Sequence, residues 1–241
     1  MKTRTLLLSL ITIFVLLTLI VSVSAQTRKV GVSAGNKFRY SVTASWNSND
    51  PDATIPSSIV DLQNTQWEEI TITAISGTNV SGRTTDHFNN NTEYSIYGWV
   101  DVNTGAGNNL NPLFVSTNLF AGNPVYTSSP FNTWFINESV HRTYLSGARL
   151  TNGLHRISSS GNETYVNDIY WDTLTGAAVE TGQEITNQSG EYVTTTLTHS
   201  QIVSSNVWTV PEFPNGPVSL VMLVALIFVS LVVLGRKPKT P

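Results

Sequence analysis

Regular alternation between apolar and polar side chains constrains the fold of this sequence more than any other feature. Between residues 37 and 46 every second residue is apolar, in the series Phe38, Tyr40, Val42, Ala44 and Trp46. Successive side chains of an extended strand point to opposite faces of a sheet. The pattern therefore predicts a strand with one face toward a core and the other toward water. We expect Tyr40 and Trp46 to be buried and Lys37 and Arg39 to be exposed.

Most of the chain repeats this pattern between short polar turns. Further strands are predicted at 67–75, 80–88, 92–102, 134–145, 149–158, 163–172, 177–185 and 190–202. Glycine and asparagine dominate the intervening segments, and both tolerate the backbone angles of tight hairpins. A hairpin at Asn152-Gly153 is an alternative within this series. The sequence predicts a mainly β fold: a single antiparallel, curved and half-barrel-like sheet domain.

One or two short helices are expected among the strands. Proline is favoured at the start of a helix, so Pro56 marks a helical turn or two over 56–62. Asn111 has the character of an N-cap and Pro112 that of the first helical residue. A second short helix is therefore predicted over 112–120, ended by Gly122.

The two ends of the chain are predicted to direct its export and its anchoring. Basic residues, an apolar stretch and Val23-Ser24-Ala25 have the order of a secretory signal peptide. An uncharged run over 218–234 is at the short end of what crosses a hydrocarbon core of ~30 Å. Basic residues follow that run, and such residues stay cytoplasmic. We expect these segments: signal peptide 1–25, extracellular β domain 26–210, linker 211–217, transmembrane helix 218–234 and basic cytoplasmic tail 235–241.

Charge and cysteine content exclude several classes of protein. Residues 26–217 carry sixteen acidic and eight basic side chains, so their net charge is −8. Such a surface repels phosphates, so nucleic acid is not an expected partner. The sequence contains no cysteine, which removes disulfides and thiolate metal ligands. Stability must therefore come from an apolar core.

Five Asn-x-Ser/Thr sequons lie in or beside predicted turns, where a glycan can be accommodated. They begin at Asn79, Asn90, Asn137, Asn162 and Asn187. Together with the predicted export signal, they indicate a glycosylated surface protein.

The residue patterns that commonly carry catalysis do not fit a recognised site. Gly31-Val32-Ser33-Ala34-Gly35 has the spacing of a nucleophile elbow, but such an elbow leads into a helix, and here a strand is predicted to follow. Glu68 and Glu69 are adjacent, and neighbours on a strand point to opposite faces. We therefore expect no catalytic residue, no cofactor and no enzymatic activity.

Metal ligands are equally sparse in the sequence. The histidines lack the spacing of a zinc site, and they stand singly at His87, His141, His155 and His199. The segment from Asp101 to Gly105 begins like a calcium loop, but Pro112 occupies the twelfth position, where a glutamate is required. Residues 47–52 are also rich in oxygen ligands. Ordinary turns explain both loops, so no metal site is assigned, and weak calcium binding there is an open alternative.

Aromatic side chains are the remaining candidates for a binding site. In the strand at 92–102, Tyr97 and Trp99 share a face opposite to that of Tyr94 and Ile96. Aromatic residues on an exposed sheet can stack on sugars or line an apolar pocket. We expect, however, that the helix at 112–120 covers Tyr97 and Trp99.

The end of the chain resembles the PEF-type tails of archaeal surface proteins. The resemblance rests on the motif Pro211-Glu212-Phe213-Pro214, the apolar helix after it and the basic residues Arg236-Lys237. It implies an anchoring or sorting signal, which an archaeosortase-type enzyme can process.

The exported region resembles uncharacterised archaeal secreted proteins. The shared residues are Gly31, Gly35 and Tyr40 at its start, a hairpin from Tyr170 to Gly176, and Ser205–Trp208 before the tail. The hairpin, with its Asp172-x-x-Thr175-Gly176 turn, is also similar to one in bacterial lipoprotein-carrier half-barrels. There a curved sheet surrounds short helices and holds an acyl chain.

These observations lead to two functional hypotheses. The first is a non-catalytic, membrane-anchored module of the cell envelope that contacts a glycan or an envelope protein. The alternative is a carrier or sensor of an apolar, lipid-like ligand within the curved sheet. A continuous apolar cavity favours the carrier, and a filled core with exposed aromatic residues favours the binding module.

Overall fold

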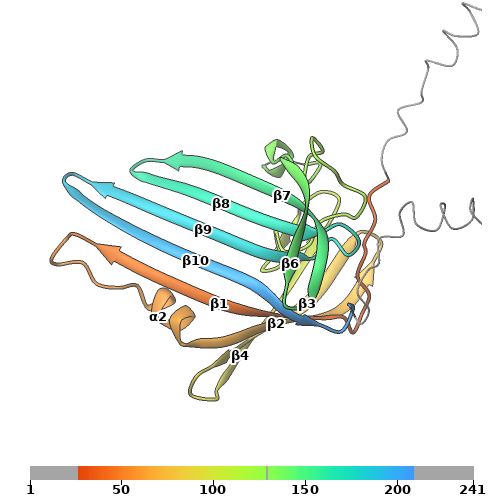
Figure 1. Ribbon diagram of the computed structural model, residues 1–241, viewed down its shortest axis with the longest axis horizontal. Coiled ribbons are helices and arrows are strands. Elements are labelled where there is room, and N and C mark those ends of the chain that lie inside the picture. Colours follow the sequence, from red (N-terminus) through yellow and green to blue (C-terminus); the bar gives the residue numbers. More distant parts are fainter. Residues whose placement is uncertain (1–26, 129, 209–241) are drawn as a thin grey trace, which may run out of the picture.

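The computed structural model describes residues 27–128 and 130–208. Ten antiparallel strands form one open sheet in the order β5-β4-β3-β2-β1-β10-β9-β8-β7-β6 (Figure 1). In chain order the elements are β1 (Lys37–Ser48), α2 (Ser57–Asn64), β2 (Thr65–Ser76), β3 (Asn79–Phe88), β4 (Glu93–Asp101), β5 (Gly107–Asn108), the 3₁₀ helix η1 (Phe131–Thr133), β6 (Glu138–Tyr144), β7 (Gly147–Ser160), β8 (Glu163–Asp172), β9 (Ala178–Ser189) and β10 (Tyr192–Ser205). A mainly β domain with one antiparallel sheet is confirmed.

The predicted strands are present, with bounds that differ by a few residues. The largest differences are at the start of β6, which begins at Glu138 because η1 precedes it, and at the end of β9, which continues to Ser189. Gly153 lies inside β7 and pairs with Glu138 and Tyr170. The alternative hairpin at Asn152-Gly153 is therefore wrong. The first predicted helix is confirmed as α2, with Pro56 as its N-cap residue.

The second predicted helix, at 112–120, is wrong. Phe114 forms a β-bridge with Ala177, and the Val115 amide donates to the Gly176 carbonyl oxygen at 2.9 Å. The segment thus runs in extended form beside the β8–β9 turn. Pairing there satisfies backbone groups and buries apolar side chains, and tertiary contacts of this kind override a local helix preference.

The curved sheet surrounds a filled core. Tyr40 and Ile202 lie on what we call the inner face, and Lys37 and Arg39 lie on the outer face. Both halves of the sheet direct buried side chains inward. The space between them is filled by the segment that connects β5 to β6, which we call the connecting segment. It contributes Leu110, Phe114, Val115, Leu119, Val125, Tyr126 and Ile136.

Beyond this core the five longest strands continue as a single layer. Figure 1 shows β1, β10, β9, β8 and β7 extending side by side away from the connecting segment. We call this part the wing and define it as residues 43–48, 155–160, 163–168, 182–189 and 192–200. Trp46 lies on the inner face of the wing and is half-buried. The prediction that it would be buried, like Tyr40, is thus only partly met, because the core ends before Trp46.

Helix α2 follows the free edge of β1 in the wing. Strand β2 pairs with β1 only as far as Tyr40, which leaves the following backbone groups of β1 unpaired on that side. Gln63 of α2 donates to the Ala44 carbonyl oxygen at 3.3 Å. Covering an edge in this way limits unwanted strand pairing.

In the described part of the chain no helix is long and apolar enough to cross a membrane. The predicted signal peptide, the linker with Pro211–Pro214, the apolar run 218–234 and the basic tail lie outside the described residues.

Candidate functional site

The outer side of β1–β4 forms a continuous surface that we call the aromatic face. Strand pairing places Lys37, Thr71, Arg83 and Tyr97 in one row across four strands. The neighbouring rows complete the surface. It comprises Lys37, Arg39, Trp67, Glu69, Thr71, Ser81, Arg83, Thr85, His87, Glu93, Ser95, Tyr97 and Trp99.

Strand β4 is held along both edges, which fixes the direction of its outer side chains. Strand β3 pairs along one edge. On the other edge, the Trp99 amide donates to Asn108 Oδ1 at 3.1 Å, and Asn109 Nδ2 donates to the Tyr97 carbonyl oxygen at 2.9 Å. Gly98 points inward, and a Cβ there would lie 2.7 Å from the Asn108 carbonyl oxygen. This glycine lets the next segment approach closely, so Tyr97 and Trp99 face outward on a rigid support.

Tyr97 and Trp99 are exposed, with 68% and 41% of their surface accessible. The prediction that residues 112–120 cover them is wrong, because that segment packs on the inner side against Ala177. No aromatic or cationic side chain among residues 27–128 and 130–208 stacks on either ring. The exposed part of each ring is therefore available to a partner.

Trp67 differs from Tyr97 and Trp99 because other side chains cover its ring. The Arg39 guanidinium lies 4.1 Å from its ring centroid, and the His87 ring stacks on it at 4.7 Å and 3°. Because β2 lies between β1 and β3, the two groups approach the indole from opposite sides. Trp67 is thus a structural part of the aromatic face, and its ring faces are already covered.

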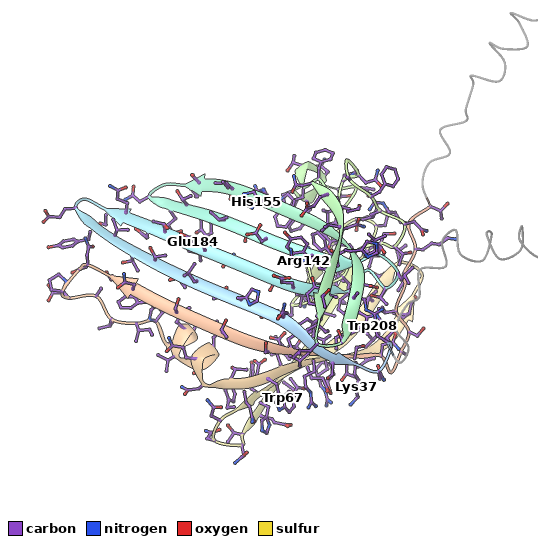
Figure 2. The ribbon with its side chains drawn as sticks, in the orientation of Figure 1. Lys37, Trp67, Arg142, His155, Glu184 and Trp208 are labelled. Atoms are coloured by element: carbon purple, nitrogen blue, oxygen red, sulfur yellow. The ribbon has the colours of Figure 1, made fainter. Side chains whose placement is uncertain are left out.

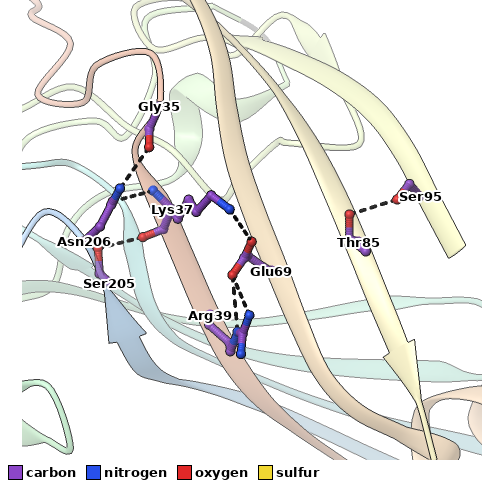
Figure 3. Close-up of polar contacts among 8 residues, drawn as sticks. All are labelled: Gly35, Lys37, Arg39, Glu69, Thr85, Ser95, Ser205 and Asn206. Carbon is purple, nitrogen blue, oxygen red and sulfur yellow. Dashed lines mark hydrogen bonds and ion pairs between the residues drawn. The ribbon is translucent and has the colours of Figure 1, made fainter. Parts of the chain in front are cut away.

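Polar contacts fix the centre of the aromatic face (Figure 3). Glu69 accepts from Lys37 Nζ at 3.2 Å and from Arg39 Nη2 at 2.9 Å. Burial alone would raise the pKa of Glu69, but the hydrogen bonds from Arg39 and Lys37 lower it overall. Thr85 and Ser95 share a hydrogen bond of 2.8 Å between their hydroxyl groups. Glu69 therefore stays ionised and holds two of the three cations in place.

A second polar cluster lies on the other half of the sheet, where β6 folds across β9. Glu180 Oε2 accepts from Arg142 Nη2 at 2.7 Å and from the Tyr144 hydroxyl at 3.2 Å. His199 Nε2 lies 3.3 Å from Oε1 of the same carboxylate. The Arg142 guanidinium also sits 3.9 Å from the centroid of the Tyr170 ring. Figure 2 shows Arg142 at this crossing, away from Lys37 and Trp67. These contacts anchor the β6–β7 hairpin.

The fold gives three of the four histidines acidic neighbours that sequence spacing did not reveal. Cross-strand placement brings His155 within 2.7 Å of Asp168, and His87 within 3.2 Å of Glu93. His199 meets Glu180 as described above. No group of three or more potential metal ligands occurs in the part of the chain that the structure describes.

A pair of carboxyl groups that sequence reasoning missed lies on the inner face at β2 and β3. Glu68 and Asp86 are directly opposite in the ladder, next to Tyr40. Burial, and then the charge and hydrogen bond of Asp86, raise the pKa of Glu68 to about 7. Glu68 and Glu69 do point to opposite faces as predicted, and the partner of Glu68 comes from the next strand. Such a cross-strand pair is visible only once the strand register is known.

The oxygen-rich loops use their side chains to fix turns. Asp101 Oδ1 accepts from the amides of Asn103 and Thr104 at 2.8 and 3.2 Å. Asn49 Oδ1 accepts from the Val193 amide at 2.6 Å, which ties the loop to β10. Ser33 precedes a turn that leads directly into β1, so the nucleophile-elbow pattern is followed by a strand, as expected.

The five sequons differ in accessibility. Asn90, Asn137 and Asn162 are exposed, whereas Asn79 and Asn187 are half-buried. Asn90 lines an open pocket of about 610 Å³ between the end of α2 and the β3–β4 turn. Asn187 Nδ2 donates to Glu163 at 3.1 Å. Glycosylation itself stays a prediction, and exposure favours the first three sites.

The Asp172-x-x-Thr175-Gly176 motif closes the β8–β9 hairpin. Asp172 Oδ1 accepts from both the amide and the hydroxyl of Thr175 at 2.8 Å. Gly176 has a φ of 69°, and a Cβ there would lie 2.1 Å from the Val115 carbonyl oxygen. Trp171 Nε1 donates to the Pro112 carbonyl oxygen at 2.8 Å. The motif therefore specifies the β8–β9 turn, and it packs against the connecting segment.

Comparisons with known proteins leave the family open. No family model matches the chain, and no curated protein matches it. Among solved structures, the chain is similar to the zebrafish ileal bile acid-binding protein complexed with cholic acid, with a TM-score of 0.21 and 9% identity. The alignment covers 72% of this chain and 99% of the other. A likeness this low carries no argument about function.

Proposed function

We propose that this chain is a non-catalytic, surface-anchored domain that binds polysaccharide through the aromatic face. One observation carries the proposal: Tyr97 and Trp99 present open rings on a strand that is pinned along both edges. Rigid aromatic side chains lose little conformational entropy on binding and contribute strongly to interfaces. Hydroxyl and charged groups beside them supply hydrogen bonds for a sugar. The apolar run at 218–234 in the sequence supports the proposed anchoring.

Substitution of the two exposed rings tests this function. We expect Trp99→Ala and Tyr97→Ala each to weaken binding of the full chain to immobilised polysaccharides by about ten-fold, as for aromatic side chains that become buried when a complex forms. Phe120→Ala is the matched control, because Phe120 is 57% exposed and lies off the aromatic face. Equal binding by all variants would reject the aromatic face as the binding surface.

A second candidate function is a carrier for an apolar ligand on the inner face of the wing. Trp46, Tyr165 and Ile185 lie in one row across β1, β8 and β9 and are half-buried. An acyl chain lying along this row would bury them further. Native mass spectrometry of the full chain from its host tests the carrier, which predicts a bound lipid that Ile185→Glu removes.

A further inference from the structure

We infer that the polysaccharide bound by the aromatic face is acidic and that Arg83 receives its carboxylate. This inference rests on the proposed function and names the class of its ligand. Arg83 is exposed on β3 and lies directly opposite Tyr97 on β4. Opposed side chains in an antiparallel pair have their Cβ atoms about 5 Å apart. An arginine fork therefore stands beside the open ring.

Arg83 differs from the other cations of the aromatic face in its charge balance. Lys37 and Arg39 share Glu69, whose lowered pKa keeps it ionised. No carboxylate within residues 27–128 and 130–208 lies in ion-pair distance of Arg83. Of the cations Lys37, Arg39 and Arg83 on the aromatic face, Arg83 is thus the one whose charge is available to a ligand.

The position of the Arg83 charge indicates the class of ligand, because the domain as a whole is acidic. Residues 26–217 carry sixteen acidic and eight basic side chains, and three of those eight lie on the aromatic face. The planar guanidinium binds a carboxylate through two parallel hydrogen bonds. A uronic acid combines a ring that stacks on Tyr97 or Trp99 with a carboxylate at its edge, which matches the juxtaposition of Arg83 and the two rings.

Nucleic acid and a protein partner fit these features less well. Nucleic-acid binding draws its affinity from many phosphate contacts, and Arg83 supplies only one. A sugar chain held by stacking on Tyr97 or Trp99 needs only one carboxylate contact. Ser81 lies opposite Trp99, and Thr71 lies beyond Arg83 in the row of Tyr97, whereas the centre of a protein interface is predominantly apolar. Hydroxyl groups suit the many hydroxyls of a sugar chain.

The test compares polygalacturonate with its methyl ester, which has the same sugar chain without the charge. Immobilised polysaccharides are titrated with the full chain, with three variants at charged residues and with Trp99→Ala. We expect the full chain to bind polygalacturonate about ten-fold more tightly than the ester, and Arg83→Gln to abolish that difference. Arg83→Lys should restore only part of it, because lysine lacks the bidentate fork. Lys29→Gln, which removes an exposed charge elsewhere, should change nothing.

The outcomes separate this inference from the proposed function. Equal binding of acid and ester, with both lost in Trp99→Ala, overturns the acidic ligand and leaves polysaccharide binding intact. A preference for the acid that persists in Arg83→Gln overturns the assignment to Arg83. Binding of neither polymer, with retention of a protein partner from the envelope instead, overturns both proposals.

Discussion

The core half of the sheet and the wing are built from the same strands, yet they differ in what covers their inner face. Toward the connecting segment, Tyr40, Ile202 and Ile169 are buried. A few residues further along, the same strands carry Thr198, Gln183 and similar half-buried polar side chains. Both parts keep the two-residue alternation, which specifies a strand. Whether a second layer covers the inner face depends on whether the residues on that face are apolar or polar.

The comparison shows how one sheet can combine a stable region with a solvated one. Burial of apolar surface dominates folding free energy, and nearly all of it lies around the connecting segment. The wing is held mainly by backbone pairing and by polar side-chain contacts such as that of His155 with Asp168. We therefore expect that substitutions lower the free energy of unfolding much more in the core than in the wing.

The largest effect is expected from Phe114→Ala. Phe114 is 1% exposed and packs edge-on against Phe38 at 5.7 Å between ring centroids. Truncation should lower the free energy of unfolding by about 3–5 kcal/mol, because it leaves a cavity in the core. Chemical denaturation measures it. A loss below ~1 kcal/mol would show that the connecting segment is not the packed centre of the fold.

Glu68→Gln, at the boundary of the core, should stabilise the protein at pH 8 by roughly 2 kcal/mol. The folded chain holds the Glu68 proton up to about pH 7, whereas an unfolded glutamate releases it near pH ~4.3. The wild type therefore loses stability as pH rises from about 4.5 to 7. Denaturation at pH 4 and pH 8 checks this: the variant and the wild type should differ at pH 8 and converge at pH 4.

In the wing, Ile185→Ala should cost only about 1 kcal/mol, since the side chain is half-buried and its removal leaves no closed cavity. If this change cost as much as Phe114→Ala, the inner face of the wing would have to be covered by a further layer.

Thr196→Ala, beside Trp46 and Ile185 in the ladder, should have the smallest effect, within ~0.5 kcal/mol. Its hydroxyl group makes no hydrogen bond with the described residues. Thermal denaturation, followed by circular dichroism, is sensitive enough to detect a larger change, which would indicate that polar contacts stabilise the wing.

The sequence predicts the strands well because their pattern is local. The alternation at 37–46 and the glycine and asparagine turns located β1 and the hairpins to within a few residues. The sequence wrongly predicts a helix at 112–120 because the partners of this segment, Ala177 and Gly176, lie more than fifty residues away. Local capping signals could not reveal that pairing.

The candidate site could be predicted only in part. The shared face of Tyr97 and Trp99 follows from their spacing, but their exposure depends on where residues 112–120 pack. The stacking of His87 on Trp67 and the pairing of Glu68 with Asp86 require the β2–β3 register. A shift of this register by one residue would turn all these side chains to the other face. The sequence alone does not determine the register.

Hydrogen exchange with and without polygalacturonate tests the central claim most directly, because it distinguishes the aromatic face from the wing in one experiment. The full chain is exchanged with the polymer, and the methyl ester serves as the control. We predict slower exchange in peptides covering 79–88 and 93–101, with no change at 182–189 and 192–200. Protection confined to the wing would contradict the account and favour a ligand on its inner face.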